Sequence, residues 1–232
     1  KDKNLILIQV ESLDHIAVNP EVMPTLANLK ATGMNFKNFI SPLYMRTTSD
    51  IEFAVQTGIP PSGLNTNSMR DFGGNGYPNA IVNLFNRTRY TTASFHNYDD
   101  SIYPRNEFYD NLGYDSYMDI EDLGMEKVMW PSDVELIEKT VDLFINEPRF
   151  FVNYISVSSH AYYDMTNPNV ARNYHLFENM EVSQELKYYY SAIREFDNAL
   201  ITLILELTKS SRILDTVIVI YGEQLQLELS KE

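Results

Sequence analysis

The chain has 232 residues, of which 44% are apolar and 22% are charged, so it is long and apolar enough to bury a core. Its formal net charge of −14 argues against a nucleic-acid binder, because a polyanion would be repelled overall. The absence of cysteine excludes disulfides, thiolate zinc sites, cysteine nucleophiles and a formylglycine made from cysteine.

The N-terminal residues 1–4 lead straight into a strand pattern, so no signal peptide is expected in this chain. No apolar run approaches the ~18 residues that a membrane-spanning helix needs. Composition leaves two possibilities open: a cytosolic protein, or a protein whose membrane or export segment lies outside this chain.

Short apolar runs alternate along the chain with stretches of helical periodicity. Residues 4–10 (NLILIQV) are almost continuously apolar, which predicts a buried strand. Further strands are predicted at 90–96, 149–157 and 216–221, and helices at 24–32, 49–56, 80–87, 132–146 and 183–208. The alternation predicts an α/β fold with a mostly parallel sheet covered by helices on both faces.

The last predicted helix has an apolar stripe at steps of three and four residues, which predicts a face that packs on the core. The stripe consists of Leu186, Tyr189, Ile193, Phe196, Leu200, Leu203 and Leu207. The three consecutive tyrosines at 188–190 are interpreted as packing residues and not as a binding site.

Polar side chains follow four of the predicted strands. They are Glu11 and Ser12, His96 and Asn97, Ser158, Ser159 and His160, and Glu223 and Gln224. A lone histidine is more often structural than catalytic. However, ligands of open α/β sheets bind at the carboxyl ends of the strands, so the joint placement of these residues predicts a site.

The segment 45–53 (MRTTSDIEF) has two compatible interpretations. In the first, Thr48 or Ser49 caps a helix, and Asp50 and Glu52 in its first turn interact favourably with the helix dipole. In the second, the Thr48 hydroxyl lies in the positive field of the helix N-terminus, which stabilises an attacking alkoxide and a bound phosphate.

Four blocks together resemble lipoteichoic acid synthases and related phosphoglycerol transferases of the alkaline phosphatase/sulfatase superfamily. The blocks are residues 10–12 (VES), 48–53 (TSDIEF), 158–160 (SSH) and the late strand 217–222 (VIVIYG). They occur in the same order over nearly the whole chain. We therefore expect a single domain, 1–232, of this fold that lacks its C-terminal portion, since relatives continue well beyond the last block.

The resemblance implies a role for individual residues. Glu11 and Thr48 would bind a divalent metal, Mn²⁺ or Mg²⁺, together with Glu223 and Gln224. Thr48 would also be the nucleophile: it attacks the phosphorus of a phosphatidylglycerol head group, releases diacylglycerol, and then passes the phosphoglycerol to a growing polymer.

Substrate contacts are implied in the same way for four further residues. His160 matches a histidine that contacts the phosphoglycerol, Arg105 and Tyr103 match a segment that lines the glycerol pocket, and His96 is expected as their neighbour. The implied partners are a phosphatidylglycerol-like lipid head group or a glycerophosphate polymer, and no nucleic acid. The implied location is the extracytoplasmic face of a bacterial cell membrane, reached through membrane segments outside this chain.

The chain departs from the family at the end of the late strand. Relatives have Tyr-Gly-Asp-His there, whereas this chain has YGEQ at 221–224. Glu223 has a longer stem than aspartate, and Gln224 offers a neutral oxygen in place of an imidazole. A degenerate or truncated relative that binds envelope ligands without turnover is therefore the main alternative; a phosphatase or a sulfatase with a serine or threonine nucleophile stays open beside it.

Overall fold

The computed structural model describes residues 3–38, 47–62 and 67–223. Within them, five strands form one sheet in the order β3-β2-β4-β1-β5, and all neighbouring strands are parallel. The strands are β1 (Asn4–Val10), β2 (Thr91–His96), β3 (Ser116–Met118), β4 (Phe150–Ile155) and β5 (Thr216–Gly222). The helices are α1 (Pro24–Thr32), α2 (Thr47–Thr57), α3 (Ser68–Phe72), α4 (Ile81–Asn86), α5 (Arg105–Leu112), α6 (Asp133–Thr140), α7 (Pro168–Asn173) and α8 (Gln184–Lys209).

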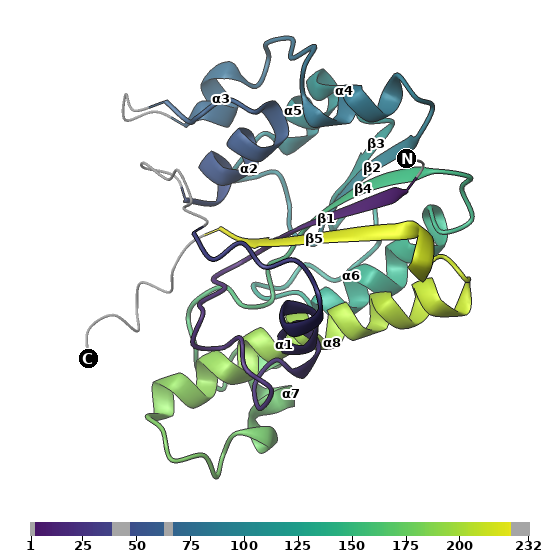
Figure 1. Ribbon diagram of the computed structural model, residues 1–232. Helices are drawn as coiled ribbons and strands as arrows, with labels where there is room; N and C mark the ends of the chain where they lie inside the picture. Colours follow the sequence, from purple (N-terminus) through teal and green to yellow (C-terminus); the bar gives the residue numbers. More distant parts are fainter. Residues whose placement is uncertain (1–2, 39–46, 63–66, 224–232) are drawn as a thin grey trace.

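Helices cover both faces of the sheet, as Figure 1 shows: α2 to α5 lie on one face, and α1, α6, α7 and α8 lie on the other. Successive side chains of β1 point to opposite faces of the sheet and therefore pack against different helical layers. Ile6 and Ile8 belong to the core beneath α6 and α8, whereas Leu7 belongs to the core beneath α2 and α5. The predicted α/β class with a parallel, doubly covered sheet is confirmed.

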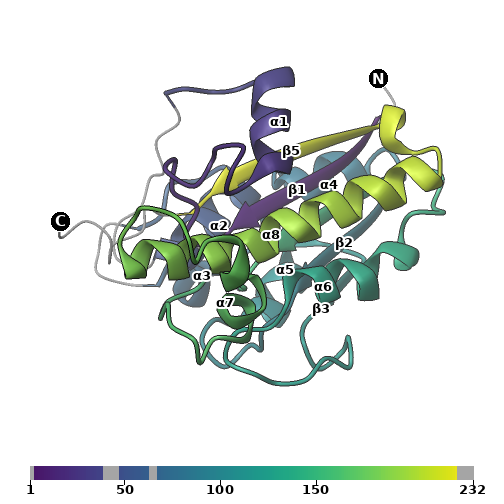
Figure 2. The same cartoon turned by 90° about the horizontal axis from the view of Figure 1, so that it is seen from below.

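The longest helix, α8, runs across the sheet (Figure 2). Its N-terminus is capped by Ser183, whose side chain accepts a hydrogen bond from the backbone N–H of Leu186. The predicted apolar stripe is confirmed, since all its members pack in the core and Leu186 alone is only partly buried. In the described part of the chain, no helix is long and apolar enough to cross a membrane.

Some elements differ from the prediction. The helix predicted at 132–146 ends at Thr140, where the Thr140 hydroxyl bonds back to the Leu136 carbonyl, and a 3₁₀ turn, Val141–Leu143, follows. The helices α3, α5 and α7 and the strand β3 were not predicted. Each has at most eight residues, which is too short for a clear apolar periodicity.

Candidate active site

Two glutamates lie side by side at the carboxyl edge of the sheet. Strands β1 and β5 pair with Val10 opposite Gly222, so the residues that follow them, Glu11 and Glu223, are neighbours. Both are buried, with 3% and 0% of their surfaces exposed. The first turn of α2 lies at the same end of the sheet as the end of β5 (Figure 1) and brings Thr48 to this pair.

Hydrogen bonds connect these side chains directly. The Thr48 hydroxyl donates to Glu223 Oε1 over 2.9 Å, and Gln9 Nε2 donates to Glu223 Oε2 over 2.9 Å. Gln9 also donates to the backbone carbonyl of Thr48 (3.2 Å), and Ser12 Oγ donates to Glu11 Oε1 (2.7 Å). The structure thus brings together Glu11, Thr48 and Glu223, three of the four residues predicted as metal ligands, while Gln224 lies outside the described residues.

The surroundings of Glu223 strongly affect its carboxyl group. Burial raises the pKa of Glu223 well above its ordinary value, and the negative charge of Glu11 and a hydrogen bond between the two carboxyls raise it further. Hydrogen bonds from Gln9 and Thr48 lower it in part. When no cation is near, Glu223 is therefore the carboxyl that favours its protonated form.

A divalent cation fits this donor set by its chemistry. Glu11, Thr48 and Glu223 offer two carboxylates and a hydroxyl, all oxygen donors of the kind that Mg²⁺ and Mn²⁺ prefer. A cation would also relieve the repulsion between the two carboxylates. Within residues 3–38, 47–62 and 67–223, no group of three or more His, Cys, Asp or Glu side chains is placed to hold a metal, so the fit rests on the two glutamates and the hydroxyl.

The backbone around Glu11 is held from the neighbouring strand and from α8. Its N–H donates to Ser156 Oγ (3.0 Å), and Ser159 Oγ donates to its carbonyl (2.6 Å). Ser12 has a left-handed backbone with φ of 51°, and the hydroxyl of Tyr189 on α8 donates to its carbonyl over 2.8 Å. A non-glycine residue in this conformation is strained and persists only where the surroundings fix it, which these contacts do.

Arg105, His96 and Tyr103 lie together on the α2–α5 face of the sheet. The Arg105 guanidinium, 3% exposed, forms a two-pronged ion pair with Glu52: Nε lies 3.0 Å from Oε1 and Nη2 lies 3.0 Å from Oε2. Arg105 Nη1 lies 3.1 Å from His96 Nε2, and the Tyr103 ring lies against the guanidinium at 5.0 Å. Tyr103 also shares a side-chain hydrogen bond with Ser49, the neighbour of Thr48.

His160 lies apart from this group. It follows β4 in an exposed loop, and its ring Nδ1 lies 2.7 Å from the carbonyl of Ala161. Among the described residues, no hydrogen bond joins His160 to Thr48 or to Arg105. The two serines before it are structural: Ser158 donates to Asp133 at the start of α6, and Ser159 holds the backbone of Glu11.

Sequence reasoning missed Gln9 and the pairing of Glu52, although both had a signal. Gln9 is the one polar side chain within the apolar segment 5–10, and it lies on the same face of β1 as Leu7 and Glu11. Glu52 lies four residues after Thr48, on the same side of α2. The interpretation of Thr48 or Ser49 as the helix cap is wrong, because α2 begins at Thr47 and both lie in its first turn.

Comparison with known proteins identifies the family of this chain. Residues 3–226 match the family model described as Sulfatase. The lipoteichoic acid synthase of Staphylococcus saprophyticus is 25% identical over 96% of this chain, and lipoteichoic acid synthase 1 of Bacillus subtilis is 27% identical over 96%. The chain spans only 36% of the length of each of these two curated relatives.

Solved structures show the same fold. The crystal structure of the lipoteichoic acid synthase LtaP from Listeria monocytogenes superposes with a TM-score of 0.87 and 29% identity, covering 100% of this chain and 58% of that one. The Streptococcus pyogenes phosphoglycerol transferase GacH, solved with sn-glycerol-1-phosphate, has a TM-score of 0.69 at 19% identity, covers 97% of this chain and 62% of that one, and thus shares the fold. The resemblance to lipoteichoic acid synthases is confirmed, and the chain belongs to the sulfatase family.

Proposed function

We propose that this chain is the phosphotransfer unit of a metal-dependent, phosphoglycerol transferase-like enzyme that uses Thr48 as its nucleophile. The substrate is a phosphodiester of a membrane lipid or of the cell envelope, with a phosphatidylglycerol-like head group as the first candidate. The observation that supports this most directly is the hydrogen bond from the Thr48 hydroxyl to Glu223, at the strand ends where Glu11 also lies. The names of the relatives support the substrate class.

The hydrogen bond defines the proposed proton transfer. Thr48 Oγ1 attacks the phosphorus, a P–O bond forms, and the bond from phosphorus to the diacylglycerol oxygen breaks. The Thr48 proton points at Glu223 Oε1, 2.9 Å away, so this carboxylate is the group placed to accept it. The departing alkoxide takes up a proton from the solvent. A hydroxyl of the acceptor polymer then attacks the phosphorus of the glycerophospho-threonine: a new P–O bond forms, the P–O bond to Thr48 breaks, Thr48 Oγ1 takes its proton back from Glu223, and the acceptor's proton passes to the solvent.

Glu11, Thr48 and Glu223 would hold the divalent cation, with Gln224 as a further predicted ligand. A bound cation supplies charge neutralisation for the phosphate and lowers the pKa of the hydroxyl that it contacts. The protein contributes the orientation: Gln9 fixes Glu223 and the backbone of Thr48, and Ser12 fixes Glu11.

Substrate contacts are proposed for His160, Arg105 and Tyr103. Tyr103 is half-buried beside the first turn of α2, which suits a side chain that lines a pocket next to Thr48. His160 is exposed and can reach only a part of the substrate that lies outside the buried group. We place the domain on the extracytoplasmic face of a bacterial membrane, because a lipid head group is available there.

A relative that binds envelope ligands without turnover is the second candidate. It is supported by Glu223, whose two carboxyl oxygens already accept hydrogen bonds from Thr48 and Gln9. Its side chain is one carbon longer than the aspartate that the family resemblance implies at this position. A displacement of about 1 Å in a catalytic group can lower the rate on the order of a hundredfold.

The test is the release of diacylglycerol from phosphatidylglycerol micelles in Mn²⁺ by wild type, Thr48→Ala and Thr48→Ser. We expect release by wild type, none by Thr48→Ala, and partial release by Thr48→Ser, which keeps a hydroxyl. Thr32→Ala, an exposed threonine on α1, is the matched control and should behave as wild type. Undiminished release by Thr48→Ala would refute the proposed nucleophile, whereas no release by any protein would favour the binding-only candidate.

A further inference from the structure

Arg105 is a buried cation that is neutralised within the protein. It is the first residue of α5 and exposes 3% of its surface. Burying a charge is costly unless a partner compensates it, and Glu52, itself fully buried, provides that partner. The Glu52 carboxylate is fixed in turn by the hydroxyl of Tyr109, which donates to Oε1 over 2.9 Å.

His96 contacts the guanidinium from another side, and its surroundings fix its tautomer. Its Nδ1 lies 3.0 Å from the carbonyl of Ile155, which can only accept, so Nδ1 carries the proton. Its Nε2 lies 3.1 Å from Arg105 Nη1, which can only donate, so Nε2 presents its lone pair. Burial, and then the charge of Arg105, lower the pKa of His96 well below its ordinary value, in agreement with a neutral ring.

One helix sets the positions of both Thr48 and Arg105. Thr48 and Glu52 are four residues apart on α2 and therefore lie on the same side of it, one turn from each other. The Tyr103 ring, which lies against the Arg105 guanidinium, bonds to Ser49 in the same first turn. Any shift of α2 that moved the Thr48 hydroxyl would move the Glu52 anchor with it.

The contacts of Arg105 with Glu52 and His96 do not use all the N–H groups of its guanidinium. An arginine has five N–H donors, and the bonds to Glu52 and His96 engage Nε once, Nη1 once and Nη2 once. One N–H on each terminal nitrogen is therefore left, and two such donors match a pair of phosphate oxygens.

We propose that Glu52 and His96 are positioning residues that hold Arg105 so that its two remaining terminal N–H groups face the phosphate of a glycerophosphate ligand. This rests on the proposed function, because the phosphate is the one that Thr48 attacks. In this assignment His96 is a neutral acceptor for Arg105 and does not contact the substrate.

The first arm of the test measures the affinity for sn-glycerol 1-phosphate by calorimetry in the presence of Mn²⁺. Removing a negative charge near an anion site tightens binding on electrostatic grounds alone. If Glu52 positions Arg105, the affinity should change in the opposite direction. Glu52→Gln should weaken binding at least about tenfold, because the guanidinium loses its bidentate ion pair with the carboxylate. Glu107→Gln, an exposed glutamate on α5, is the matched control and should stay within about twofold of wild type.

The second arm compares two substitutions of His96 and does not depend on whether Glu52→Gln folds. The side chain of His96→Gln offers a neutral oxygen near the place of Nε2, so it should keep the wild-type affinity within about twofold, whereas His96→Leu should lose at least about tenfold. Nitrogen-15 spectra of the wild-type histidines at neutral pH should show His96 protonated on Nδ1.

Four outcomes of these measurements would contradict the positioning roles of Glu52 and His96. Tighter binding by Glu52→Gln, equal loss by His96→Gln and His96→Leu, or a His96 protonated on Nε2 would overturn the assignment, as would a wild-type chain that does not bind the ligand. Turnover is not a readout in either arm. A chain that binds as expected but transfers nothing would count against the proposed function and leave the positioning roles intact.

Discussion

At the scale of single residues, the site depends on Glu223, at a position where the resemblance to lipoteichoic acid synthases implies an aspartate. Glu223 reaches Thr48 and Gln9 and contacts the carboxyl of Glu11. The longer stem displaces the carboxylate by about one carbon–carbon bond, and metal ligands must lie within about 0.2 Å of their ideal distances. The wild-type chain should therefore bind Mn²⁺ weakly.

The double substitution Glu223→Asp with Gln224→His introduces the Asp-His pair that the resemblance to lipoteichoic acid synthases implies at these positions. We expect it to tighten Mn²⁺ binding at least about tenfold, or ~1.4 kcal/mol, as measured by calorimetric titration. The single variant Glu223→Asp is the matched control that separates the shorter stem from the added imidazole. Equal affinities of wild type and the double variant would mean that these two positions do not face the metal.

The strand pattern was sufficient to predict that Glu11 and Glu223 lie at the same edge, whereas Thr48 was expected beside them only because of the family resemblance. Parallel strands end at one edge, so residues that directly follow two of them are neighbours once the strands are known to pair. The sequence was not sufficient to predict the partner of Arg105. This residue was expected to hold substrate, and it is found paired with Glu52, 53 residues away along the chain. No local pattern specifies which carboxylate meets a buried arginine.

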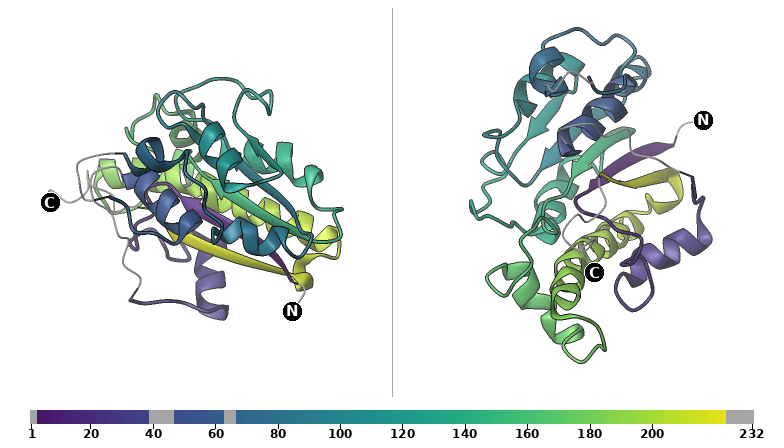
Figure 3. Two further views of the ribbon diagram at one scale, coloured as in Figure 1. Left: turned by 90° about the horizontal axis from the view of Figure 1, so that it is seen from above. Right: turned by 90° about the vertical axis from the view of Figure 1, so that its left-hand side faces the viewer.

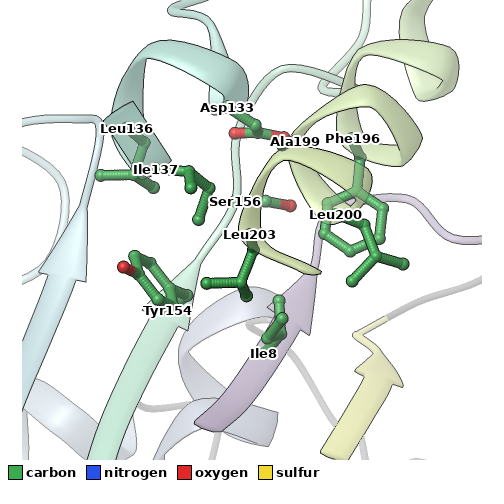
Figure 4. A pocket seen from close by; sticks show the side chains of 10 residues that line it. All are labelled: Ile8, Asp133, Leu136, Ile137, Tyr154, Ser156, Phe196, Ala199, Leu200 and Leu203. Carbon is green, nitrogen blue, oxygen red and sulfur yellow. The ribbon is translucent and has the colours of Figure 1, made fainter. Parts of the chain in front are cut away.

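At the scale of elements, the start of α6 is tied to the end of β4 through Asp133. Its Oδ1 accepts from Asn97 Nδ2 (2.9 Å) and from the backbone N–H of Val157 (3.1 Å), and its Oδ2 accepts from Ser158. Asp133 also borders a cavity of about 20 Å³ between α6, α8 and the sheet, with room for roughly one water molecule (Figure 4).

Burial raises the pKa of Asp133 from 3.8 to about 6, and the negative charge of Glu195 on α8 raises it further. The hydrogen bonds that Asp133 accepts act in the opposite direction. Between about pH 4 and pH 6 the folded chain keeps a proton that the unfolded chain has lost. The contribution of Asp133 to stability is therefore complete below pH 4 and is lost as the pH rises through 6.

Asp133→Asn should remove this contribution, because asparagine keeps the accepting oxygen and cannot ionise. Denaturant unfolding at a series of pH values should show a smaller fall in the free energy of unfolding from pH 4 to pH 7, by up to ~3 kcal/mol. Asp142→Asn, an exposed aspartate just after α6, should leave the wild-type profile unchanged. A variant profile parallel to that of wild type would show that folding does not raise the pKa of Asp133.

Long elements were predictable and short ones were not. The strand Asn4–Val10 and the helix Pro24–Thr32 have the bounds that were predicted, and α8 differs by one residue at each end. In contrast, α5 was interpreted only as part of a pocket, although Pro104 before it and Gly113 after it, with φ of 95°, are the usual signals of a helix start and end. The eight residues between these two signals are largely polar, so their apolar periodicity was too weak to predict a helix.

At the scale of the whole molecule, one layer of helices covers each face of the sheet (Figure 3). Each layer packs on an apolar core and also encloses buried polar groups: Asp133, Glu195 and Asp197 lie in the layer of α1, α6, α7 and α8, and Gln9, Glu52, His96 and Arg105 lie between the layer of α2 to α5 and the sheet. Buried polar groups of this kind are stable only when they are paired. Both faces therefore contribute to stability, and the proposed chemistry lies on the face covered by α2 to α5.

The central claim is that Thr48 becomes covalently attached to phosphorus, and peptide mass spectrometry tests it most directly. The chain is incubated with Mn²⁺ and phosphatidylglycerol, quenched in acid and digested. We predict a glycerophosphate group on the peptide that contains Thr48, localised to its hydroxyl, and no such group in Thr48→Ala. A group on Ser49 or another residue, or diacylglycerol release by wild type with Thr48 unmodified at every time point, would contradict the account.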